Sequence, residues 1–159
     1  MKNNIVYKRL VYALALCSFT NIAVAENEGP YVGANFGGII HAQDISTGFT
    51  AEANLGYQFS KYTALQISGM YGAENNSWLM TEGLLKLPLG RFITPYVLVG
   101  AGYTHLPNDS GAIDFGGGLN INITPDVSVF GQYKFVQTFS SGAPYANVIS
   151  GGMTYYFGG

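Results

Sequence analysis

Hydrophobic and polar residues alternate one by one along most of this chain. The clearest run covers residues 49–59, where Phe49, Ala51, Ala53, Leu55, Tyr57 and Phe59 alternate with Thr50, Glu52, Asn54, Gly56 and Gln58. Successive side chains of a β-strand point to opposite faces, so this run predicts a strand with one apolar and one polar face. Its length is close to the roughly 9–11 residues that a tilted strand needs to cross a bilayer.

The same alternation recurs in four further segments, at residues 65–71, 79–87, 114–123 and 127–135. Three more segments show it less sharply, at residues 31–40, 96–105 and 146–157. Turn-rich connectors separate them, at residues 41–48, 60–62, 73–77, 88–95, 106–111, 124–126 and 138–145. None is long enough for a crossover helix, so neighbouring strands are expected to be antiparallel. The pattern therefore predicts an all-β chain of eight strands in up-and-down order.

Composition agrees with strands that have one apolar and one polar face. The chain has 22 glycines and 14% aromatic residues, yet its mean hydropathy is only +0.18, so apolar residues are interleaved rather than blocked. An apolar sheet face in lipid requires closure, because unpaired edge groups would find no water there. We expect an eight-stranded antiparallel transmembrane β-barrel whose narrow interior is filled by side chains and forms no wide pore. Inward glycines such as Gly56 and Gly118 make room for larger neighbours or mark bends.

The N-terminus has the features of a secretory signal peptide. Lys2, Lys8 and Arg9 precede an apolar stretch at residues 10–16, and Ala23 and Ala25 form an A-x-A cleavage site. We therefore expect a signal peptide over residues 1–25 and a barrel domain over residues 26–159. The only cysteine, Cys17, lies in the signal peptide, so the mature protein is expected to have neither disulfides nor thiolate metal sites.

Four charged residues fall on the polar face of the predicted strands: Glu52, Glu82, Lys86 and Lys134. Buried charges must be paired, so these residues are predicted to form an ion-pair network inside the barrel. The alternative is a set of separately solvated charges in a wet interior. The formal net charge of −2 and the 10% of charged residues give no reason to expect a nucleic-acid partner.

Aromatic residues gather near the predicted strand ends, as in the interfacial belts of membrane barrels. An even number of strands puts both termini at one end, which for such barrels is the periplasmic end. Toward that end we place Tyr57, Phe59, Tyr62, Phe92, Tyr96, Phe135, Tyr155 and Phe157. Toward the opposite end we place Tyr71, Trp78, Tyr103 and Tyr145.

Two glycine-aromatic motifs, at residues 29–35 (GPYVGAN) and in residues 95–103 (PYV followed by GAGY), resemble the OmpA/OmpX-like group of outer-membrane barrels. Ser150, Gly152, Tyr155 and Phe157 match the pattern that the barrel-assembly machinery reads in the last strand of such proteins. The resemblance covers the barrel alone and not the periplasmic domain of longer relatives. It implies export to the outer membrane through periplasmic chaperones and that machinery, contact with membrane lipid and lipopolysaccharide, a monomeric state, and a role in envelope integrity or surface contact.

The sequence offers less support for an enzyme, a metal site or a soluble barrel. Some small outer-membrane barrels resemble enzymes that modify lipid A, but His41 and His105 lack the neighbouring serine of that pattern, and no catalytic role is expected. Asp44, Asp109 and Asp114 show no ligand spacing, so we interpret them as loop-solvating acids and expect no metal or cofactor. A soluble lipocalin-like ligand-binding barrel remains the structural alternative, because it would show the same alternation with its apolar face inward.

Overall fold

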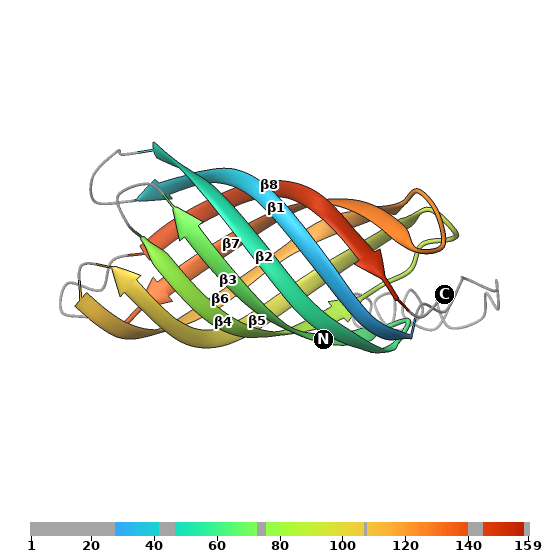
Figure 1. The fold of residues 1–159 in the computed structure, drawn as a ribbon, viewed down its shortest axis with the longest axis horizontal. Helices are drawn as coiled ribbons and strands as arrows, with labels where there is room; N and C mark the ends of the chain where they lie inside the picture. The colour runs from blue at the N-terminus through green and yellow to red at the C-terminus, as the bar shows by residue number, and fades with distance from the viewer. Residues whose placement is uncertain (1–27, 42–46, 73–75, 107, 140–144, 158–159) are drawn as a thin grey trace, which may run out of the picture.

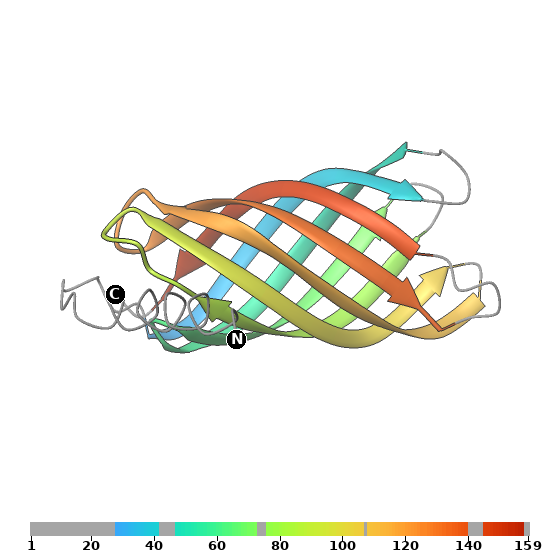
Figure 2. The ribbon, with the colours of Figure 1, turned by 180° about the vertical axis from the view of Figure 1, so that it is seen from behind.

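The chain folds into a closed antiparallel β-barrel of eight strands (Figures 1 and 2). The computed structural model describes residues 28–41, 47–72, 76–106, 108–139 and 145–157. The strands are β1 (Gly29–His41), β2 (Thr47–Ser60), β3 (Thr63–Gly72), β4 (Ser77–Lys86), β5 (Ile93–Leu106), β6 (Asn108–Asn122), β7 (Val127–Thr138) and β8 (Tyr145–Tyr156). Each strand pairs with the next, and β1 pairs with β8 from Tyr31↔Tyr156 to His41↔Ala146. The predicted fold class is confirmed.

The two ends of the barrel differ in which chain segments they hold. We call the end where β1 begins and β8 finishes the proximal end, and the other the distal end (Figure 1). The predicted signal peptide, including Ala23 and Ala25, lies outside the described residues, so it stays a prediction together with the proposed domain bounds. Among the described residues no helix is long and apolar enough to cross a membrane.

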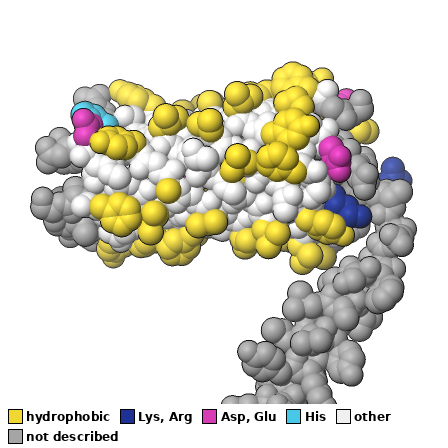
Figure 3. All heavy atoms as spheres, turned by 90° about the horizontal axis from the view of Figure 1, so that it is seen from below, with side chains coloured by type: hydrophobic (Ala, Val, Ile, Leu, Met, Phe, Trp, Pro, Cys, Tyr) yellow, Lys and Arg dark blue, Asp and Glu magenta, His cyan; other side chains and the backbone are white. Residues whose placement is uncertain are grey.

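The alternation of the sequence becomes an apolar outside and a polar inside. Phe36, Leu55 and Ile149 point outward and are each about 60% exposed. Asn35 and Gln132, in contrast, are buried in the interior. Figure 3 shows the consequence on one face: hydrophobic side chains are spread along the wall, and the charged groups visible there lie near the two ends. A soluble ligand-binding barrel would need the opposite arrangement, with its apolar face inside.

Strand β6 begins earlier than the hydrophobic pattern predicts. Residues 106–111 were expected to form a connector, but Asp109 pairs with His105 and Ser110 pairs with Thr104 in the β5–β6 ladder. Backbone pairing does not require apolar side chains, so the ladder continues past the point where the apolar face ends. The prediction of a loop was therefore wrong for residues 106 and 108–111, which belong to the two strands.

Three aromatic residues were placed wrongly in the predicted belts. Trp78 and Tyr96 are buried inside the barrel, with 4% and 6% of their surface exposed. Both residues point into the barrel. The belt prediction used only their position along the strand and did not consider which face of the strand they occupy. Phe135 lies toward the distal end, where its ring is 5.4 Å from that of Tyr145 at the start of β8.

Side chains of two hydrophobic clusters fill the two halves of the interior. The distal cluster consists of Ile39, Met70, Trp78, Met80, Ala112, Val136, Ala146 and Val148. The proximal cluster consists of Tyr31, Ala64, Leu84, Tyr96, Leu98 and Tyr156. Inward glycines admit the large rings: a Cβ added to Gly56 would clash with the Tyr31 ring, and one added to Gly118 would lie 2.6 Å from the Tyr96 hydroxyl. Their predicted role as space for larger neighbours is confirmed.

Candidate functional site: the barrel interior

One ammonium group lies between two carboxylates in the middle of the barrel. Lys134 of β7 is fully buried, and its Nζ lies 2.9 Å from both carboxylate oxygens of Glu52 on β2. The same Nζ lies 2.5 Å from Oε1 of Glu82 on β4. These are three of the four residues for which the sequence predicted a luminal ion-pair network, and they come from three separate strands.

Neutral amides complete the hydrogen bonding of both carboxylates. Asn35 Nδ2 donates to Glu52 Oε1 at 3.2 Å, and Gln66 Nε2 donates to Glu82 Oε2 at 2.6 Å. Each amide is the direct cross-strand neighbour of its carboxylate, so the strand register fixes both contacts. A buried ion pair is tolerable only when such additional bonds satisfy its remaining lone pairs.

Sequence reasoning missed a third acid, Asp114. It was interpreted as a loop-solvating residue, but it lies on β6 inside the barrel with 1% of its surface exposed. Gly100 is the cross-strand neighbour of both Glu82 and Asp114, and a Cβ added there would clash with Asp114 Oδ1 and lie 2.7 Å from Glu82 Cγ. The two acids therefore meet over this glycine. The alternation along β6 could have identified it, because Asp114 lies on the same face of the strand as the inward residue Asn120.

Lys86 does not join the predicted network. It follows Glu82 by four residues on β4, which places it roughly 13 Å nearer the proximal end at about 3.3 Å per residue. Its Nζ donates to Gln58 Oε1 at 2.7 Å and to the Tyr156 hydroxyl at 3.3 Å. It also lies 5.4 Å from the ring centroids of both Tyr31 and Tyr156. The prediction was wrong for Lys86, because two residues on the same face of a strand can lie at different heights along the barrel axis.

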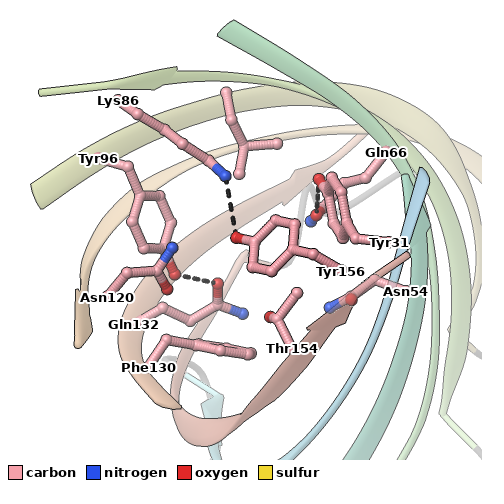
Figure 4. A pocket seen from close by; sticks show the side chains of 11 residues that line it. Tyr31, Asn54, Gln66, Lys86, Tyr96, Asn120, Phe130, Gln132, Thr154 and Tyr156 are labelled. Atoms are coloured by element: carbon pink, nitrogen blue, oxygen red, sulfur yellow. Dashed lines mark hydrogen bonds between the residues drawn. The ribbon is translucent and has the colours of Figure 1, made fainter. Parts of the chain in front are cut away.

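A small cavity of about 20 Å³ lies beside Lys86 in the proximal half of the barrel (Figure 4). Its wall includes Lys86, three tyrosines (Tyr31, Tyr96, Tyr156) and two glutamines (Gln66, Gln132), with uncharged side chains completing it. Tyr31 donates to Gln66 Oε1 at 2.9 Å, and Tyr96 donates to Gln132 Oε1 at 3.0 Å. A cavity of this size has room for about one water-sized occupant.

The four residues of the predicted assembly pattern lie on both faces of β8 and at the residue that follows it. Ser150 is buried inside the barrel, and Gly152 shares its inward phase. Tyr155 and Phe157 point outward at the proximal end, with ring centroids 5.0 Å apart. Recognition of these residues by an assembly machinery stays a prediction.

At the distal end His105 and Asp109 form an exposed pair, with Nδ1 and Oδ1 separated by 2.7 Å. The hydroxyl of the nearby Ser110 donates to the Gly111 carbonyl at 3.0 Å. The side chain of His41 lies outside the described residues. In the part of the chain that the structure describes, no three His, Cys, Asp or Glu side chains are grouped to hold a metal ion.

No family model and no curated protein sequence matches the chain. Solved structures do match it. Neisserial surface protein A is 14% identical, with a TM-score of 0.68, over 81% of this chain and 97% of that one. The N-terminal β-barrel domain of OprF from Pseudomonas aeruginosa is 11% identical, with a TM-score of 0.61, over 80% and 98%.

A third similar structure is Ail, the attachment invasion locus protein of Yersinia pestis, in complex with the heparin analogue sucrose octasulfate. It is 14% identical, with a TM-score of 0.57, over 82% of this chain and 99% of that one. At these identities the likeness concerns the fold, which is that of small outer-membrane β-barrels. Membership of the OmpA/OmpX-like group in particular stays a prediction.

Proposed function

We propose that this chain is an integral outer-membrane protein whose barrel spans the bilayer and serves envelope integrity or surface contact. The observation that carries the proposal is the inverted distribution of side chains in a closed barrel. Soluble monomers rarely expose contiguous apolar patches beyond a few hundred Å², whereas here apolar side chains are exposed on every strand. Closure pairs all eight strands and leaves no open edge in lipid.

The filled interior supports a structural role rather than transport through a wide pore. The two hydrophobic clusters occupy the distal and proximal halves, and Lys134 with its two carboxylates lies between them. Two similar barrels are named as a surface protein and as an attachment invasion locus protein. Their names support surface contact as the class of role that the distal end of this barrel could have.

The proposal includes the route by which the chain reaches the membrane. The predicted signal peptide over residues 1–25 would direct export, and periplasmic chaperones would deliver the chain to the barrel-assembly machinery. Tyr155 and Phe157 lie exposed at the proximal end of β8, where such a machinery could contact them. We expect the proximal end to face the periplasm, the wall to contact phospholipid and lipopolysaccharide, and the protein to be monomeric.

Heat-modifiability in the outer-membrane fraction tests this proposal. Cells are fractionated, and unboiled and boiled samples of each fraction are compared on SDS gels. We expect the protein in the membrane pellet, with a mobility that shifts on boiling because a closed barrel resists detergent. A soluble band without a shift would overturn the proposal in favour of the lipocalin-like alternative.

A further inference from the structure

Lys86 is a buried cation without an acidic partner among the described residues. Only 5% of its surface is exposed, and its Nζ contacts two neutral oxygens and the faces of two tyrosine rings. An ammonium group has three hydrogens to donate, and two of them are used by Gln58 and Tyr156. One donor and one full positive charge therefore remain beside the cavity, where burial makes an uncompensated charge costly.

A second unused donor faces the same cavity. Gln132 is 7% exposed, and its amide nitrogen has no hydrogen-bond partner within the described residues. Its carbonyl oxygen accepts from Tyr96, which orients the amide so that the nitrogen points away from that ring. Figure 4 shows the Gln132 amide nitrogen turned toward Tyr156 and Thr154 at the centre of the site.

Three amide oxygens near the cavity are already engaged, whereas the amide oxygen of Asn54, which also lines the cavity, has no hydrogen-bond partner among the described residues. The amide oxygens of Gln58, Gln66 and Gln132 each accept a bond from Lys86, Tyr31 and Tyr96 respectively. A water molecule can accept from Lys86 or Gln132 and donate to Asn54, but it supplies no negative charge to balance the ammonium group. The described side chains that form the wall include one lysine and no carboxylate, so the wall carries a surplus of positive charge.

We propose that this cavity binds a small monovalent anion, chloride in the cell, through Lys86 Nζ and Gln132 Nε2. The volume of about 20 Å³ suits a single-atom ion and excludes a phosphate or a carboxylate ligand. The anion supplies the charge that Lys86 lacks locally. Glu52 and Glu82 bind Lys134 deeper in the barrel and do not line the cavity.

Bromide is the probe, because its anomalous scattering distinguishes it from water. Crystals of the detergent-solubilised protein are soaked in bromide, and we expect an anomalous peak within hydrogen-bond distance of both nitrogens. The peak should be absent in Lys86→Met. In Gln132→Glu it should also be absent, because the new carboxylate takes the place of the ion. A cavity that holds only water in the wild type, or a peak that persists in Lys86→Met, would overturn the proposal.

Thermal unfolding in micelles provides a second measurement that does not depend on crystals. Chloride is titrated against gluconate at constant ionic strength, and the wild-type Tm should rise by about 3–5 °C by ten times the dissociation constant. Gln132→Glu should show no chloride dependence, and a wild-type Tm independent of chloride would contradict the site. Because each variant is first tested for a heat-modifiable band, loss of the anion site is distinguishable from failure of the proposed membrane fold.

Discussion

Replacing Lys134 with methionine tests the central ion cluster. Methionine keeps much of the length and volume of the lysine but removes the ammonium group that lies within 2.9 Å of Glu52 and 2.5 Å of Glu82. Both carboxylates are 5% exposed or less, so water cannot take the place of the lost cation. Each would keep its amide donor, Asn35 or Gln66.

The expected cost follows from the burial of the two carboxylates. Removing one partner of a buried ion pair typically costs about 3–5 kcal/mol, because the remaining charge is left uncompensated. Here one ammonium group serves two carboxylates, so we expect a value of about 5 kcal/mol. With a urea dependence of about 2 kcal/mol per molar, the unfolding midpoint should fall by about 2.5 M.

Urea unfolding in detergent micelles, followed by tryptophan fluorescence, measures this change. The matched control is the triple variant Lys134→Met, Glu52→Gln, Glu82→Gln, which removes all three charges and keeps the shapes. It should recover most of the lost stability, because replacing a whole buried pair by neutral groups is often close to neutral. A midpoint unchanged in Lys134→Met would refute the reasoning and favour independently solvated charges.

Four further changes test other parts of the structure. Gly118→Ala should lose about 1–3 kcal/mol, because its Cβ would lie 2.6 Å from a tyrosine hydroxyl inside the barrel; Gly131→Ala, with nothing within 4 Å, should stay within about 0.5 kcal/mol in the same urea assay. Asp114→Asn should raise the unfolding midpoint, because it replaces a buried acid beside Glu82 with a neutral amide of the same shape; a lower midpoint would contradict this. His105→Ala should leave lipid A unchanged by mass spectrometry, and a lost modification would establish an enzymatic role. Phe157→Ala should slow insertion by purified assembly machinery while leaving unassisted folding into micelles unchanged. If the variant inserted with the machinery as fast as the wild type, Phe157 would not be part of the assembly signal.

The fold could be predicted because burial that alternates from one residue to the next can be recognised within a short stretch of sequence. In β4 every second residue is buried and the residues between are exposed or partly exposed, as the sequence predicted. The strand ends were less predictable. Asp109 and Ser110 continue the β5–β6 ladder although they lack apolar side chains, because hydrogen bonding of the backbone extends beyond the apolar band.

The sequence predicted which charged side chains point into the barrel, but not which of them contact one another. Lys134 meets Glu52 across 82 positions of sequence, and no local pattern encodes that distance. The alternation correctly turned Lys86 inward, yet its height along β4 separates it from the cluster. Asp114 was missed because it was interpreted by its neighbours in sequence, although its phase on β6 already placed it inside.

The interior charges have a physical role beyond the pairwise energy of their ion pairs. A barrel that was apolar on both faces would lose little if a strand slipped by one residue, because either face would suit the lipid. Here a slip of β7 by one residue would turn Lys134 outward, at a cost of about 2–4 kcal/mol near the bilayer midplane. It would also leave two buried carboxylates without their cation. The central cluster therefore selects one register for β2, β4 and β7 together, which explains how a costly buried charge contributes to a unique barrel.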